Sequence, residues 1–210
     1  MTLGPNVGGG GENELPLLRR EPDIHPTSIF GLSASQAPWW VAHVRSRQEK
    51  ALARYLRPLD VPFYLPQAER RVRRGNRTFV SHLPVFPGYL FFRGLAASRL
   101  VALRSNLIVK VLDVSDQELL SEELTQLRCL QESGAALIPC APIVTGDSVR
   151  IVEGPFKGYR GIVLKSAERP RLVVSISILR KAVAVELERD AVALEPIAAA
   201  SRSAVRAAVA

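Results

Sequence analysis

The sequence LPVFPGYLFF, residues 83–92, decides how the first half of this chain folds. Its two prolines, Pro84 and Pro87, have no backbone N–H donor and a fixed φ, so the stretch is not helical. Pro87 with Gly88 predicts a turn, because proline presets one corner and glycine accepts positive φ at the next. Residues 89–92 form a short apolar run, which predicts a central strand.

The aromatic side chains of this stretch allow two interpretations. In the first, they belong to a core strand that is reached through a kink. In the second, Phe86, Tyr89 and Phe91 also line a surface on which a partner binds, since tyrosine combines a large apolar body with a polar tip. Of these three, we expect Phe91 above all to be a core residue.

Composition and charge narrow the class of protein. The 210 residues allow one domain or two small ones, and 47% are hydrophobic, as in ordinary globular proteins. A net charge of +8 predicts an anionic partner, with nucleic acid as the first candidate. Two cysteines, Cys129 and Cys140, favour neither a zinc site nor a disulfide framework, and a reduced, cytoplasmic setting is expected. We expect no secretory signal, no membrane span and no metal or other cofactor.

The pattern along residues 1–134 predicts a leader and one domain. Residues 1–37, rich in Gly, Pro and Ser, predict a disordered leader. A strand is expected at 39–44, followed by a helix that a capping box of Ser46 and Glu49 begins.

Residues 69–77, ERRVRRGNR, predict a basic hairpin with its tip at Gly75. A second capping box, Ser115 with Glu118, begins a helix with leucines on one face. The order β-α-β-β-β-α-β-α over residues 38–134 predicts an α+β fold, with helices packed on a mainly antiparallel sheet.

The second half of the chain has a different pattern. Residues 135–145 contain two prolines and no apolar period, which indicates a linker. Residues 146–196 contain five short strand-like runs, which predict a small closed barrel. Residues 197–210 are rich in Ala, Ser and Arg and are expected to form a flexible tail.

Residues 149–163, VRIVEGPFKGYRGIV, resemble a KOW motif. Its glycines allow sharp turns and close approach of strands, and its aromatic side chains add buried apolar surface to a small barrel. The positions concerned are Gly154, Phe156, Gly158, Tyr159 and Gly161. KOW barrels also occur in ribosomal proteins, so this motif alone leaves open a ribosome- or RNA-binding protein.

Three further segments, residues 39–56, 64–66 and 84–92, resemble the N-terminal (NGN) domain of the NusG family, in the family's order. The resemblance implies an NGN α/β sandwich, an antiparallel sheet flanked by helices, followed by a small SH3-like β-barrel KOW domain. It implies a monomeric transcription elongation or antitermination factor, not an enzyme, that suppresses pausing or termination. An apolar groove would bind the clamp of RNA polymerase, and the residues expected there are Trp40, Phe86, Tyr89 and Phe91.

The resemblance also implies a contact with DNA. The hairpin arginines would lie near upstream DNA and the non-template strand, because the planar guanidinium suits phosphate. Arginines beside the first strand are candidates for the same face. The full set is Arg45, Arg47, Arg70, Arg71, Arg73, Arg74 and Arg77. A hairpin that is simply solvated remains the alternative.

Within the family, a specialised paralogue of the RfaH type is favoured. The KOW partner loop contains Ile178, Leu179 and Arg180, where housekeeping members typically place Phe-Gly-Arg. In the family this loop contacts Rho or a small-subunit ribosomal protein, and loss of the aromatic counts against Rho. A housekeeping factor that also assists Rho remains the alternative. Residues 172–178 are dense in Val and Ile, so we expect a stable β barrel, tethered flexibly, instead of a helical form.

Overall fold

The computed structural model describes residues 23–75, 77–140, 147–152, 157–164, 171–186 and 194–196. Its first half is built on a five-stranded sheet in the order β1-β3-β6-β2-β7, in which every neighbouring pair is antiparallel. The strands are β1 (Ile24–His25), β2 (Trp39–Val44), β3 (Phe63–Tyr64), β6 (Tyr89–Arg93) and β7 (Ile108–Leu112). The strand predicted at residues 89–92 is the middle strand of this sheet.

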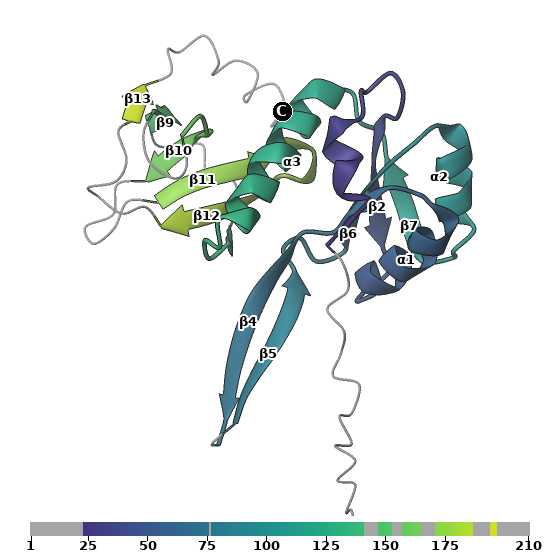
Figure 1. Cartoon of the computed structure of the whole chain (residues 1–210), viewed down its shortest axis with the longest axis horizontal. Coiled ribbons are helices and arrows are strands. Elements are labelled where there is room, and N and C mark those ends of the chain that lie inside the picture. The colour runs from purple at the N-terminus through teal and green to yellow at the C-terminus, as the bar shows by residue number, and fades with distance from the viewer. Residues whose placement is uncertain are drawn as a thin grey trace, which may run out of the picture.

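Helices cover both faces of the sheet (Figure 1). Helices α1 (Glu49–Leu56) and α2 (Ala96–Leu103) pack on one face, through Leu52, Leu56 and Ala102. Helix α3 (Gln117–Glu132) packs on the other, and its leucines share a core with Trp39, Val41 and Phe91. The predicted α+β sandwich is therefore confirmed.

The turn before the central strand forms as its sequence predicts. The Tyr89 backbone N–H donates to the Phe86 carbonyl oxygen over 3.1 Å. Gly88 between them has φ of +87°, which only glycine adopts without strain. The turn places the Tyr89 ring at the start of β6.

Both predicted capping boxes are wrong in detail. Helix α1 has no side-chain cap, and Glu49 instead accepts a hydrogen bond of 2.6 Å from the Gly88 backbone N–H, where its carboxylate is buried. Helix α3 is capped by Asp116, whose carboxylate accepts from the Leu119 N–H. Each segment has a glutamate at the spacing of a capping box. In the folded protein, however, Glu49 accepts from the turn at Gly88, and Asp116 takes the place of Ser115 as the cap of α3.

Part of the predicted leader is structured. Residues 24–31 form β1 and a short 3₁₀ helix, η1 (Thr27–Gly31), and Ile29 is fully buried. The buried Arg93 guanidinium donates to the carbonyl oxygens of Ile29, Leu32 and Ala37 at 2.9, 2.8 and 2.7 Å. The prediction fails here because this segment has no period of its own and is held by a side chain from the sheet.

The basic hairpin is present as a separate two-stranded ribbon. Strands β4 (Gln67–Arg74) and β5 (Arg77–Pro84) pair without a break in register, and Gly75 at the tip has φ of +59°. Figure 1 shows the ribbon projecting from the body of the molecule. Its base is tied to α1, since Lys50 Nζ donates to the His82 carbonyl oxygen over 2.7 Å.

The second half forms a small β-rich unit. Six antiparallel strands pair in the order β13-β9-β10-β11-β12-β8. They are β8 (Ile138–Cys140), β9 (Asp147–Ile151), β10 (Arg160–Leu164), β11 (Arg171–Ile176), β12 (Lys181–Glu186) and β13 (Leu194–Pro196). Of residues 172–178, which are expected to be β, residues 172–176 lie in β11, whereas 177 and 178 belong to a short 3₁₀ turn. Residues 197–210, predicted as a tail, lie outside the described residues.

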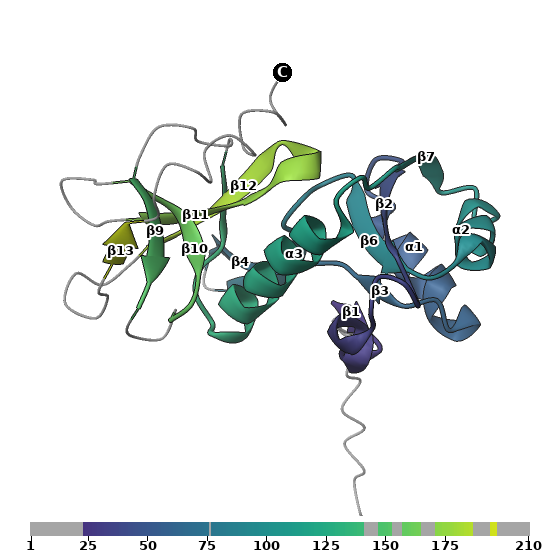
Figure 2. The ribbon, with the colours of Figure 1, turned by 90° about the horizontal axis from the view of Figure 1, so that it is seen from above.

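The predicted linker and flexible tether need correction. Within residues 135–145, β8 pairs with β12, so this part of the expected linker is an edge strand of the second sheet. Proline is tolerated there because an edge strand has donors that need no partner. Figure 2 shows α3 lying between the second unit and the first sheet. One apolar cluster includes Phe91 of the sheet, Leu127 of α3 and Leu179 of the second unit.

Candidate functional site

The Tyr89 side chain, like that of Trp40, is a partly exposed aromatic group of the set predicted to bind a partner. Its ring is half-buried and stacks on His43, with ring centroids 5.1 Å apart. Lys181 Nζ also lies 4.8 Å from the ring centroid, in the range of a cation–π contact. Lys181 begins β12, so the second unit covers part of this predicted surface.

Phe86 and Phe91 are core residues that support the Tyr89 turn. Their exposed fractions are 2% and 0%, and their rings meet edge to face at 6.3 Å. The expectation that Phe91 is a core residue is confirmed, and Phe86 shares that status. Neither ring lines a surface in this structure.

Trp40 lies on the opposite face of the sheet from these two rings. Successive side chains of a strand alternate between faces, and Trp40 packs against the core beneath α1 and α2. Its Nε1–H donates to the Gly94 carbonyl oxygen over 2.7 Å, and Arg99 lies 5.5 Å from its ring centroid. The four aromatics predicted for one groove are therefore divided between two faces.

The predicted DNA-binding arginines fall into two places. Four are exposed on the ribbon, namely Arg70, Arg71, Arg73 and Arg77. The side chain of Arg74 is not among those that the structure describes. Arg45 and Arg47 are exposed in the turn between β2 and α1, where Arg47 has φ of +59°. The ribbon alone thus concentrates positive charge on a projecting element.

Three of the KOW-motif residues can be placed. Gly158 has φ of +92°, and a Cβ at Gly161 would lie 2.5 Å from the Val173 carbonyl oxygen. Glycine at Gly161 is thus required by the close approach of β10 and β11. Tyr159 packs against the core, and burial, followed by a hydrogen bond with Cys129, raises the pKa of its hydroxyl. Gly154 and Phe156 lie outside the described residues.

The predicted partner loop contacts the first half of the molecule. It contains the 3₁₀ turn η3 (Ser177–Leu179), with Leu179 buried, Ile178 half-buried, and Arg180 exposed with φ of +49°. The backbone N–H of Ser177 donates to Glu123 Oε1 and Oε2 at 3.1 and 3.0 Å, and its hydroxyl donates to Oε1 at 2.5 Å. This loop is therefore engaged with α3.

Glu123 is the site residue that sequence reasoning missed. Its exposed fraction is 8%, and burial raises the pKa of its carboxyl to about 7, against the opposing effect of the Ser177 hydrogen bonds. The sequence did contain an indication of this role, because Glu123 lies on the same helix face as the apolar residues Leu120 and Leu127. A charged residue in that position indicates a polar contact inside an interface.

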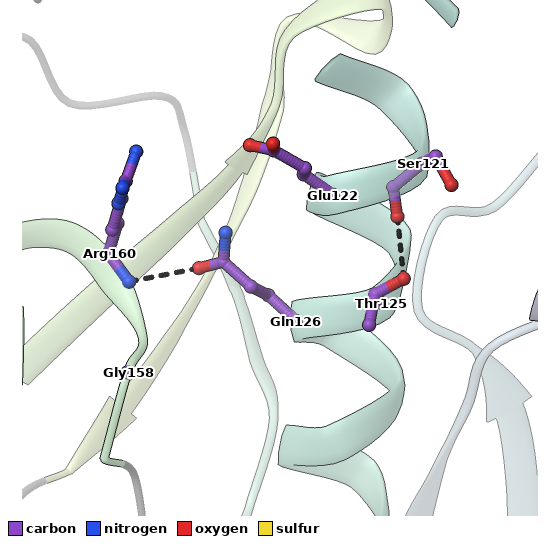
Figure 3. Close-up of a pocket in the computed structure, with 6 residues that line it drawn as sticks. All are labelled: Ser121, Glu122, Thr125, Gln126, Gly158 and Arg160. Atoms are coloured by element: carbon purple, nitrogen blue, oxygen red, sulfur yellow. Dashed lines mark hydrogen bonds between the residues drawn. The ribbon is translucent and has the colours of Figure 1, made fainter. Parts of the chain in front are cut away.

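A polar hollow of about 350 Å³ lies at the seam between α3 and the start of β10 (Figure 3). It is lined by Ser121, Glu122, Thr125, Gln126, Gly158 and Arg160. Gln126 Oε1 accepts from the Arg160 backbone N–H over 3.1 Å, and Thr125 bonds back to the Ser121 carbonyl oxygen. The polar groups of this hollow thus join the two halves of the molecule.

Within the described residues, no group of three or more His, Cys, Asp or Glu side chains is placed to hold a metal ion. None of the helices in that same part of the chain is long and apolar enough to cross a membrane.

The fold defines a class of protein: an NGN-type α/β sandwich with a basic ribbon, joined to a small KOW-type β domain. Residues 37–126 match the family model described as transcription termination factor nusG, and residues 145–167 match the KOW motif. Together the two matches span just over half of the chain. The chain belongs to the NusG family. Members of this family are non-enzymatic transcription factors that act in elongation and termination and interact with RNA polymerase.

No curated protein matches the chain. A solved structure concerning domain interaction in Thermotoga maritima NusG is 18% identical in sequence. The alignment covers 79% of this chain and 100% of that one, with a TM-score of 0.43.

Proposed function

We propose that this protein is a transcription elongation and antitermination factor whose first domain binds the clamp of RNA polymerase. The observation that carries the proposal is the placement of Tyr89. Its ring lies at the start of β6, directly after a turn. The buried Glu49 carboxylate accepts a hydrogen bond from this turn, and the buried rings of Phe86 and Phe91 pack against each other in the core next to it. An aromatic side chain on a rigid base is typical of a residue that dominates a protein interface.

The proposed contact set differs from the one expected from sequence. Tyr89 and His43 form the contact, while Phe86 and Phe91 maintain its shape from the core. Trp40 faces the opposite side of the sheet and is left out of this contact. The arginines of the ribbon would lie near the upstream DNA or the non-template strand, where each phosphate contact adds salt dependence.

Pause suppression requires that the protein bind two states of polymerase with different affinity. A factor that binds the pause-resistant state more tightly by about 1–2 kcal/mol shifts that equilibrium roughly five- to thirty-fold. A domain that holds the clamp in one position provides this preference without any catalytic group.

The second domain is proposed as an adaptor that reaches other factors through the loop at Ile178, Leu179 and Arg180. In the docked arrangement this loop contacts Glu123 and Lys181 covers Tyr89. Both surfaces would therefore become available together when the domains separate. The absence of an aromatic residue from the loop favours an RfaH-type paralogue, acting as a monomer in the cytoplasm, over a factor that assists Rho.

In vitro transcription through a pause site tests the proposal. We expect the wild-type protein to shorten the pause and Tyr89→Ala to lose this effect. Tyr55→Ala is the matched control, because Tyr55 is a half-buried tyrosine of α1, the helix that packs on the other face of the sheet. Equal activity of the two variants would contradict the Tyr89 assignment.

The same purified protein distinguishes this proposal from two alternative functions. Binding to purified ribosomal subunits without an effect on polymerase would favour a ribosome- or RNA-binding KOW protein. Stimulation of Rho-dependent termination would favour a housekeeping factor.

A further inference from the structure

The two faces of the β4–β5 ribbon differ in chemistry. Side chains alternate along each strand, and the cross-strand pairs Val72–Phe79 and Arg71–Val80 show which residues share a face. We name the faces after their exposed apolar residues. The Phe79 face contains Arg70, Val72, Arg77, Phe79, Ser81 and Leu83, and the Val80 face contains Glu69, Arg71, Arg73, Thr78, Val80 and His82.

The cations of the Val80 face are already engaged within the ribbon. Arg71 Nε lies 2.5 Å from Glu69 Oε1, so one carboxylate offsets one guanidinium. Arg73 Nε donates to the Gly75 carbonyl oxygen at 3.3 Å, which draws that side chain toward the tip. On this face, therefore, one guanidinium charge is offset by a carboxylate and the other guanidinium is hydrogen-bonded to the backbone.

The Phe79 face has uncompensated charge around an exposed ring. It contains no acidic residue, and among the described residues neither Arg70 nor Arg77 has a side-chain hydrogen bond or ion pair. Phe79 is 52% exposed, and the residue opposite it on β4, Val72, is itself partly buried. Arg77 lies two residues before Phe79 on β5, and Arg70 lies two residues before Val72 on β4, so the register places Phe79 between these two arginines on one face.

We propose that the Phe79 face binds single-stranded nucleic acid. A base stacks on the Phe79 ring, and Arg70 and Arg77 bind the phosphates on either side. Arginines alone would attract any polyanion, but an exposed aromatic ring between them suits an unpaired base, whose flat face is free. In a duplex that face is occupied by the neighbouring base pairs. The net charge of +8 favours the same class of partner over a protein surface.

The inference rests on the proposed nucleic-acid role of the ribbon and makes it specific to one face and one kind of strand. It does not depend on polymerase, so it is tested with the full chain and labelled 12-nucleotide probes alone. Fluorescence anisotropy would compare a single-stranded DNA, an RNA of the same sequence, and the DNA duplex. Tighter binding of either single strand than of the duplex is expected, and the DNA and RNA arms show which is preferred.

Phe79→Ala and Val80→Ala form a matched pair, because both side chains are 52% exposed, on opposite faces of the same strand. Loss of a stacking contact should weaken single-strand binding about 5- to 100-fold in Phe79→Ala. Val80→Ala should change it by no more than about twofold. Neither side chain is buried, so both variants should fold, which circular dichroism would verify.

The arginines are tested by salt dependence. Arg70→Gln and Arg77→Gln should each lower the slope of log affinity against log salt by about 0.7 for a single strand. Arg104→Gln, the control at an exposed arginine outside the ribbon, should leave the slope nearly unchanged. A Phe79→Trp variant adds a direct reading, since a stacked base should quench its fluorescence.

Three results would overturn the inference. The first is equal loss of binding in Phe79→Ala and Val80→Ala. The second is equal affinity for single strand and duplex without an effect of Phe79, which would mean general attraction to phosphate. The third is no oligonucleotide binding together with weaker polymerase binding by Phe79→Ala, which would assign the face to a protein contact. None of these results bears on the Tyr89 assignment.

Discussion

Glu123 in α3 and Ser177 in the partner loop are joined by three hydrogen bonds, although 54 residues separate them in the chain. The carboxylate accepts from both the backbone N–H and the hydroxyl of Ser177. Because Glu123 is buried at this contact, its protonation is linked to the docking of the two domains.

The first prediction concerns the pH dependence of docking. Burial raises the Glu123 pKa from its ordinary 4.5 to about 7 in the docked form. The docked form therefore binds the proton more tightly, and the contribution of Glu123 to docking is fully present below about pH 4.5. It is lost as the pH rises through about 7. NMR of the Ser177 amide and of domain tumbling should show less docking across this range.

Glu123→Gln and Glu122→Gln provide the comparison. The first keeps a hydrogen-bonding side chain without a titrating group and should dock with little pH dependence. The second removes an exposed neighbouring charge that helps to raise the Glu123 pKa, so docking should still depend on pH, with its midpoint moved to slightly lower pH. An unchanged Ser177 amide shift between pH 4.5 and 7 in the wild-type protein would contradict the assignment.

The second prediction separates the core aromatics from the surface tyrosine. Phe91→Ala should lower the free energy of unfolding by about 3–5 kcal/mol, because the ring is fully buried and leaves a cavity. Tyr89→Ala removes a half-buried ring at the surface and should lower it much less. Urea denaturation at 25 °C measures both values. Similar losses in the two variants would mean that Tyr89 is also a core residue.

The third prediction concerns Arg93, which holds the segment before β2. Arg93→Met removes three hydrogen bonds to buried carbonyl groups and should cost about 3 kcal/mol or more. Arg104→Met, at an exposed arginine, should change stability by less than about 0.5 kcal/mol. Limited proteolysis should cut residues 23–37 faster in Arg93→Met only. Protection equal to wild type would show that the apolar contacts of Ile29 suffice.

The fourth prediction concerns Gly161 in the KOW motif. A methyl group there would meet the Val173 carbonyl oxygen at 2.5 Å and the Leu172 side chain at 2.8 Å. Since a paired backbone cannot yield easily, Gly161→Ala should destabilise the second domain by about 1–3 kcal/mol. Hydrogen exchange of β10 and β11 would report the loss. Gly31→Ala, where a Cβ meets nothing within 4 Å, should leave the exchange rates unchanged.

The sequence by itself determined the local elements. Proline and glycine at positions 87 and 88 encode the turn, and the apolar run after them encodes the middle strand. The arginine-rich hairpin is encoded by alternation on both sides of Gly75. These features depend on the backbone preferences and the alternation of side chains within a few residues. They can therefore be predicted from one sequence without knowledge of the rest of the fold.

Only the tertiary structure decided which surfaces remain exposed. Alternation shows that Trp39 and Trp40 face opposite ways, but the packing of α1 and α3 determines what each face meets. The structure of residues 24–37 depends on Arg93, and the burial of Glu123 depends on Ser177. A buried polar group must find a hydrogen-bond partner, and partners far apart in the chain are brought together only by the complete fold.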